Sequence, residues 1–338
     1  MNYVRDSAMQ NVKTLTLIIS TCNRCQILKK NLEKMLRSRC MDVEFLICDN
    51  ASADNTWKYL ESIDDDRVFV QHNAVNYGFE NFWLVSEGVK TKFFMFVNDR
   101  DYIEPYEIAV LVSMLQNMDD VDFISNEKRN LNAGYYTWKD ALDIYFQSRH
   151  PGTLIYNTDF IKKYMDFGFI KTYLEQGRAE LANNYLVFQI LLNVQRIYVY
   201  GRNPINQPLN RERIPKVRKE YYKEPYISLV YREKEYDDWI IKGLEHINAE
   251  RTKDIMLAIY KDSIMTVTWE YYFSLKIPGM ARRNGCEEHK AKEWKKNGIL
   301  FMQHVLGNKN FRKFGLDKEI LKETWKNYKE TLWKVMEW

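Results

Sequence analysis

Short apolar runs alternate with segments of helical periodicity along the N-terminal part of the chain. Between the runs, apolar residues recur at spacings of three and four, as in Ile27, Leu28, Leu32 and Met35, which is typical of amphipathic helices. Strands that alternate with helices predict an α/β fold with a mostly parallel central sheet, flanked by helices and built with right-handed crossovers. The runs that predict strands lie at residues 15–20, 43–48, 68–71, 93–97, 121–125 and 197–200, and residues 150–156 predict a turn that enters a strand.

One of these runs ends in a pair of carboxylates. Residues 93–97 are apolar throughout, which predicts a strand buried on both faces of a parallel sheet. Asp99 and Asp101 follow directly, and open α/β sheets bind their ligands at the carboxyl ends of the strands. Two carboxylates there suit a hard divalent cation, Mn²⁺ or Mg²⁺, that bridges to substrate phosphates. An Asp-rich turn without a metal is the alternative.

The pattern changes after a long helix that is expected from about Ala179 to Asn193. The stretch from Asn203 to Pro215 contains three prolines and little periodicity, which predicts a loop. The chain beyond it is rich in helical pattern and poor in proline. We therefore expect a catalytic α/β domain over residues 1–222 and a helical domain over residues 223–338.

Composition excludes several classes of protein. The chain of 338 residues has only 13 glycines, and neither G-x-G-x-x-G nor G-x-x-x-x-G-K-[ST] occurs. That counts against a dinucleotide-binding enzyme and a P-loop protein. The net charge of +4 is mild, and no nucleic-acid-binding motif accompanies the basic clusters, so we expect no nucleic-acid partner.

The cysteines and the hydropathy indicate where the protein works. Cys22 and Cys25 form a C-x-x-C, but Cys40 and Cys48 are a poor second pair for zinc, so reduced thiols are expected. Residues 1–10 are polar and carry no apolar signal core. No run approaches the ~20 apolar residues that span a bilayer. We expect a cytoplasmic protein, with peripheral contact at the inner face of the plasma membrane left open.

Four short motifs follow one another within residues 14–103. They are Leu17 to Arg24 (LIISTCNR), Phe45 to Thr56 (FLICDNASADNT), Asn76-Tyr77-Gly78 followed by Asn81, and Asp99-Arg100-Asp101. In this order they resemble family 2 glycosyltransferases of the GT-A fold, of the type that builds bacterial surface polysaccharides. The resemblance weakens beyond residue 103, and nothing is recognised beyond about residue 222.

The resemblance implies an inverting transferase that moves a sugar from a nucleoside diphosphate donor, expected to be a UDP-sugar. The acceptor would be a glycan or a lipid-linked glycan. Asp101, with Asp99, would hold the metal, and Asp49 would accept a hydrogen bond from the base. For Asp49, and also for Ser52 and Asp54, helix capping and turn chemistry are the alternative. The residues implied to bind the donor nucleotide are Thr21, Asn23, Arg24, Asp49, Asn76, Gly78, Asp99 and Arg100.

Inversion also requires a general base for the acceptor hydroxyl. The family usually places a Glu-Asp pair before the long helix, and this chain lacks the pair there. Glu180 is the first candidate and Glu175 the second. His150, Arg211 and Arg213 are candidates for the donor or acceptor pocket, with a structural histidine and a solvated basic loop as the alternatives.

The missing pair also leaves other functions open. One alternative is a nucleotide-sugar-binding protein of the same fold with altered or no catalysis. A separate alternative is a nucleotidyltransferase, whose sheet and aspartates can look alike, although the first loop lacks the glycine-rich basic pattern of such enzymes.

Two interpretations of the C-terminal region also stay open. Its basic and aromatic residues, from Arg282 to Lys296 and from Trp325 to Trp338, suit a helix on an anionic membrane surface. The same aromatic stripe also suits packing on the catalytic domain or on a second copy of the chain.

Overall fold

The computed structural model describes the chain in two compact units. The first comprises Met1–Ala179 and Asn193–Arg213, and the second Glu180–Leu192 and Ile214–Trp338. Within them, the residues described are 12–78, 81–126, 131–147, 154–175, 179–206, 229–261, 300, 303–304, 307–336. The expected domain boundary near Tyr222 lies outside these residues, as does the basic stretch from Arg282 to Lys296.

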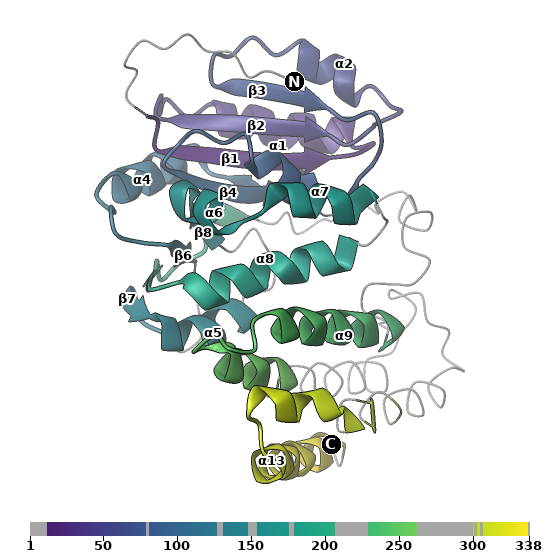
Figure 1. Ribbon diagram of the computed structural model, residues 1–338. Coiled ribbons are helices and arrows are strands. Elements are labelled where there is room, and N and C mark those ends of the chain that lie inside the picture. Colours follow the sequence, from purple (N-terminus) through teal and green to yellow (C-terminus); the bar gives the residue numbers. More distant parts are fainter. Residues whose placement is uncertain are drawn as a thin grey trace. The chain divides into compact units, whose positions relative to one another are not determined.

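The first unit is built on an eight-stranded mixed sheet (Figure 1). Its strand order is β3-β2-β1-β4-β8-β6-β9-β7, and the pairs from β3 to β4 are all parallel. Beyond β4, only β6 and β9 pair in parallel, because β8 and β7 run antiparallel to their neighbours. The strands are β1 (Leu15–Thr21), β2 (Val43–Asp49), β3 (Val68–His72), β4 (Phe93–Asn98), β6 (Phe123–Ser125), β7 (Gly134–Thr137), β8 (Leu154–Asn157) and β9 (Arg196–Val199).

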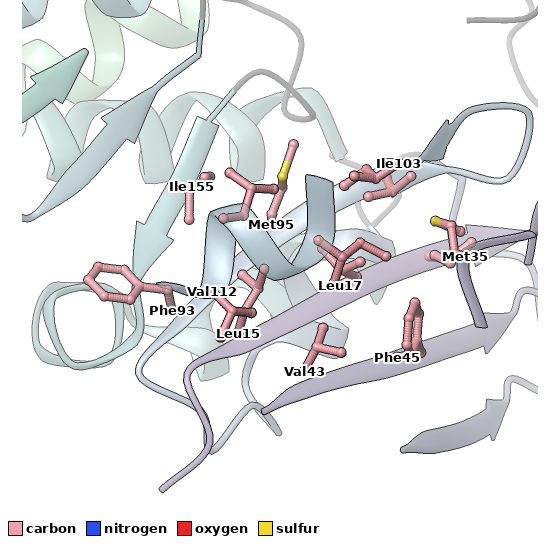
Figure 2. Close-up of a cluster of buried hydrophobic side chains, with 14 of the residues drawn as sticks. Leu15, Leu17, Met35, Val43, Phe45, Phe93, Met95, Ile103, Val112 and Ile155 are labelled. Atoms are coloured by element: carbon pink, nitrogen blue, oxygen red, sulfur yellow. The ribbon is translucent and has the colours of Figure 1, made fainter. Parts of the chain in front are cut away.

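Helices cover this sheet, as the alternating pattern predicts. Leu15 and Leu17 of β1 and Phe45 of β2 point into one apolar layer with Met35 of α1 and Val112 of α4 (Figure 2). These side chains are at most 3% exposed, so the layer fixes the positions of the strands that carry the polar ends. The helices of this unit are α1 (Cys25–Leu36), α2 (Thr56–Glu61), α3 (Asn81–Ser86), α4 (Pro105–Gln116), α5 (Trp138–Gln147), α6 (Thr158–Tyr164) and α7 (Phe167–Glu175).

Several elements were not expected from the pattern. β7 and α5 were not among the predicted elements, and their packing with β9 is a tertiary contact. The loop predicted from Asn203 also contains a strand, because β10 (Ile205–Asn206) pairs antiparallel with β5 (Tyr102–Ile103). A two-residue strand leaves no periodicity in the sequence. This small second sheet anchors the chain directly after Asp101.

The second unit is helical in its described residues, as predicted. It contains α8 (Ala179–Asn193), α9 (Leu229–Glu245), a helix over residues 252–261, the 3-10 helix η5 (Lys309–Phe314) and α13 (Lys318–Met336). Tyr236 of α9 lies against Phe311 of η5, with ring centroids 5.5 Å apart. Asn184 of α8 donates to the backbone of Glu235 at 3.1 Å, which places α8 against α9. No helix within the described residues has the length and apolar content needed to cross a membrane.

Candidate functional site

Polar residues from four neighbouring strand ends meet at the carboxyl edge of the parallel half of the sheet. β1, β2 and β4 are paired in register, so Ser20 lies beside both Cys48 and Asn98. The polar residues at and after these strand ends form hydrogen bonds to one another across neighbouring strands. Parallel strands bring the residues after them to one edge, which is where open α/β sheets bind ligands.

Asp99 is paired with a cation from the first loop. Both of its carboxylate oxygens lie within hydrogen-bond distance of Arg24 Nη1, at 2.7 and 2.8 Å. The Asp99 side chain is 1% exposed, so its charge is neutralised inside the protein and not by water. Its backbone carbonyl accepts a hydrogen bond from Asn31 of α1 at 3.0 Å. The pair locks the β4 end to the β1 loop across 75 residues of sequence.

Asp101 is the carboxylate of the D-x-D motif that Arg24 does not neutralise. It is 8% exposed, its Oδ2 accepts from Asn98 Nδ2 at 3.0 Å, and its backbone N–H donates to the Asn98 carbonyl at 2.9 Å. Arg100 between the two aspartates is partly buried.

A divalent cation at this edge of the sheet would have to share its ligands between the protein and a substrate. Among the described residues, no group of three or more His, Cys, Asp or Glu side chains could hold a metal ion. Mg²⁺ is usually bound by one or two carboxylates together with substrate phosphates and water. Asp101 supplies such a carboxylate at the ligand-binding edge of the sheet.

The loops after β1 and β2 are bonded to each other. Asn23 donates its backbone N–H to Ser52 Oγ at 2.8 Å, and its side-chain oxygen accepts from the Ala53 backbone at 2.6 Å. Asn23 and Ala51 both have positive φ, at 53° and 60°. Left-handed backbone is uncommon outside glycine and is found where the surrounding structure enforces it, often at functional sites.

Asp54 holds the first turns of two helices. Its Oδ1 accepts from the Thr56 backbone at 2.9 Å, and its Oδ2 accepts from the Cys25 backbone at 3.2 Å. Free N–H groups at helix N-termini need such acceptors. The capping interpretation is therefore confirmed for Asp54, whereas Ser52 serves the turn through Asn23.

Asn50 organises the segment after β3. Its Nδ2 donates to Asn76 Oδ1 at 2.7 Å and to the Gly78 carbonyl at 3.1 Å, while its Oδ1 accepts from Tyr77 N–H at 3.0 Å and from Asn73 Nδ2 at 3.1 Å. Gly78 has φ of 68°, a conformation that favours glycine. Asn76 and Gly78, predicted to bind the donor, thus stand in a hydrogen-bonded loop centred on Asn50.

Replacing Asn50 should loosen this loop. Asn50→Ala leaves buried donors and acceptors of the loop unpaired, so we expect the free energy of unfolding to fall by about 2–3 kcal/mol. Urea denaturation measures this change. Asn55→Ala is the matched control, because Asn55 precedes α2 without a side-chain capping bond and should cost under about 0.5 kcal/mol. Equal losses in the two variants would show that the network contributes nothing.

Asp49 is more deeply enclosed than the sequence suggests. Its side chain is 0% exposed, its Oδ1 accepts from the Ser52 backbone at 3.2 Å, and its Oδ2 lies 2.9 Å from Nδ1 of His72. His72 was not predicted to belong to the site. It ends a strand as Asp49 does, and that position was the sequence feature that could have identified it.

The thiols near the site are neutral. Burial raises the pKa of Cys22, and the charge of Asp49 raises it further. Burial also raises the pKa of Cys25, and that of Cys48 to about 11. Protonated thiols are poor zinc ligands and poor nucleophiles. The described cysteines are free, as expected for reduced thiols.

The remaining candidates are placed only in part. Glu175 is the last residue of α7, and Glu180 lies in the first turn of α8. His150, Arg211 and Arg213 lie outside the described residues. Thr21 is 2% exposed at the end of β1, and its Oγ1 has no hydrogen-bond partner within the described structure.

The parallel half-sheet, its polar carboxyl edge and the D-x-D turn together correspond to an α/β fold of the GT-A type. Comparison with family models gives a match to "Glycosyl transferase family 2" over residues 16–178. The matched region makes up just under half of the chain, and it identifies the protein as a glycosyltransferase. The comparison with curated proteins gave no match.

Solved structures agree in fold. The crystal structure of S. aureus TarS 1-349 in complex with UDP-GlcNAc is 17% identical, with a TM-score of 0.58 over 86% of this chain and 81% of that one. The same TarS fragment in complex with UDP is 15% identical, with a TM-score of 0.51 over 95% and 91%. At these identities the similarity establishes the fold, and it extends over most of the chain.

Proposed function

We propose that this glycosyltransferase moves a sugar from a UDP-sugar to a glycan or lipid-linked acceptor, with inversion and with a divalent cation at Asp101. Asp101 carries the proposal, because it places a carboxylate without a cationic partner in the described structure beside a neutralised Asp99. The family match to residues 16–178 supports sugar transfer. Two observations favour UDP. Asp49 is buried and hydrogen-bonded to His72, which provides hydrogen-bond acceptors at the carboxyl edge, and crystal structures of TarS contain UDP-GlcNAc and UDP.

The charges around Asp99 and Asp101 indicate different roles for the two aspartates. A diphosphate leaving group gains negative charge as the glycosidic bond breaks, and a bound Mn²⁺ or Mg²⁺ would stabilise that charge. Arg24 already balances Asp99, so Asp99 braces the loop and Asp101 offers its carboxylate to the cation. The buried Thr21 Oγ1, which lacks a partner in the described structure, would gain one from the nucleoside.

Calorimetric titration of the whole chain tests the proposal. We expect UDP to bind with Mn²⁺ present and to bind at least about tenfold more weakly without it, with GDP weaker than UDP under both conditions. Failure of both nucleotides to bind, with and without Mn²⁺, would overturn the proposal. GDP binding in place of UDP would keep the transferase and replace the donor.

The assignment of the general base is tested separately. Glu180→Gln should lower UDP-sugar turnover by about 10²–10⁴-fold, because the amide cannot take the acceptor proton, and should leave UDP affinity unchanged. Release of UDP from the sugar donor measures turnover. Glu175→Gln is the comparison, and a loss confined to that variant would assign the base to Glu175 instead.

A further inference from the structure

Three residues on neighbouring strands form a row at the carboxyl edge. Thr21 of β1 is in register with Asp49 of β2, which is in register with His72 of β3. Residues in register on adjacent strands project to the same face of a sheet. Thr21 and Asp49 are buried, whereas 41% of the His72 side chain is exposed. Solvent, and therefore a ligand, reaches this row at the imidazole.

The hydrogen bond to Asp49 determines which ring nitrogen of His72 carries the proton. An ionised carboxylate only accepts hydrogen bonds, so Nδ1 of His72 carries the proton in the 2.9 Å contact with Asp49 Oδ2. In the neutral ring, Nε2 then has a lone pair and acts as an acceptor. Trp57 of α2 lies beside the ring, with centroids 4.9 Å apart and planes at 45°. Asp49 and Trp57 thus hold the His72 ring, and its Nε2 makes no hydrogen bond to a described residue.

We infer that His72 reads the nucleobase of the donor through Nε2, and that Asp49 is a positioning residue that sets its tautomer. The inference rests on the proposed function and replaces the expected direct contact of Asp49 with the base. An acceptor selects a base whose pairing edge carries a ring N–H, as in N3–H of uracil. It disfavours cytosine, whose N3 is itself an acceptor.

The hydrogen bond from the Ser52 backbone amide determines how an asparagine would be oriented in the variant Asp49→Asn. The Ser52 N–H donates to Asp49 Oδ1, so an asparagine at this position must keep its oxygen toward Ser52. The asparagine NH₂ group then faces Nδ1 of His72, which must become the acceptor. Nε2 becomes the donor, and the edge that it presents now matches N3 of cytosine. Asp49→Asn should therefore change the base preference and not merely weaken binding.

Calorimetric titration with UDP and CDP, both with Mn²⁺, provides the test. The unmodified protein should prefer UDP by about tenfold or more, and His72→Phe, which keeps the aromatic contact with Trp57, should lose about ten- to a hundredfold in UDP affinity and most of that preference. Asp49→Asn should move the preference toward CDP. Gln71→Leu, the preceding exposed residue on the same strand, is the control and should keep the original ratio.

The outcomes separate the inference from the function on which it rests. An unchanged UDP-to-CDP ratio in His72→Phe, with UDP still bound, would overturn the inference and leave the transferase proposal standing. Absence of nucleotide binding by the unmodified protein would overturn both. Should His72→Phe fail to fold, His72→Gln decides, because its amide both donates and accepts and should bring the ratio close to one.

Discussion

Replacing Asp101 with asparagine should lower UDP-sugar turnover by about a thousandfold or more and remove the metal dependence of UDP binding. The amide keeps the shape of the side chain and an oxygen for the contact with Asn98 Nδ2. It loses the negative charge that attracts the cation, and with it the stabilisation of the leaving diphosphate. A thousandfold loss corresponds to about 4 kcal/mol of transition-state stabilisation. Turnover and calorimetry at several Mn²⁺ concentrations measure the two effects.

Two comparisons make the Asp101 result specific. Asp120→Asn removes an exposed carboxylate whose partner is Arg196, and it should leave turnover unchanged. Asp99→Asn removes the charge that Arg24 neutralises, and it should affect stability more than the metal dependence of binding. A variant at Asp101 that still requires Mn²⁺ and turns over normally would contradict the role assigned to this carboxylate.

Breaking the pair between Arg24 and Asp99 should produce the largest loss of stability. Arg24→Met leaves the Asp99 carboxylate almost fully buried and without its cation, so we expect the free energy of unfolding to fall by about 3–5 kcal/mol. Urea denaturation measures it. The double variant Arg24→Met with Asp99→Asn should recover much of the loss, because it no longer buries an unpaired charge.

The surface pair of Arg196 and Asp120 provides the matched control. These side chains are 47% and 79% exposed and 3.3 Å apart. Arg196→Met should cost no more than about 1 kcal/mol, because water solvates both charges of an exposed pair. Similar losses from Arg24→Met and Arg196→Met would mean that burial of Asp99 carries no penalty.

The sequence was most informative for β4, because this strand is part of the core and leads directly into the candidate metal-binding carboxylates. The apolar run before Asp99 predicted a buried strand with carboxylates at its end, and β4 is paired on both sides. The pairing of Asp99 with Arg24 was not predictable from spacing, since 75 residues separate them. Both residues were assigned to the donor site from the family resemblance, whereas their mutual contact required the three-dimensional structure.

Residues whose role depends on a contact with another part of the chain were harder to assign than residues that belong to a sequence motif. Asn76 and Gly78 were predicted from their motif, yet Asn50 is the side chain that joins them to β2. His72 lies on an edge strand whose residues are partly or fully exposed, so its burial pattern gives no indication of a role. Its place at the strand end, in register beside Asp49, shows that it shares the site.

The placement of α8 in the second unit has a consequence for synthesis on the ribosome. The chain passes from the first unit to α8, returns to form β9 and β10, and then leaves again. Phe188 of α8 packs beside Trp239, which emerges about 50 residues later. A nascent chain that has completed the whole sheet still carries one apolar helix without its later partners. Truncation after Asn206 would preserve every strand of both sheets and yet remove Trp239, so that Phe188 of α8 would lose this contact.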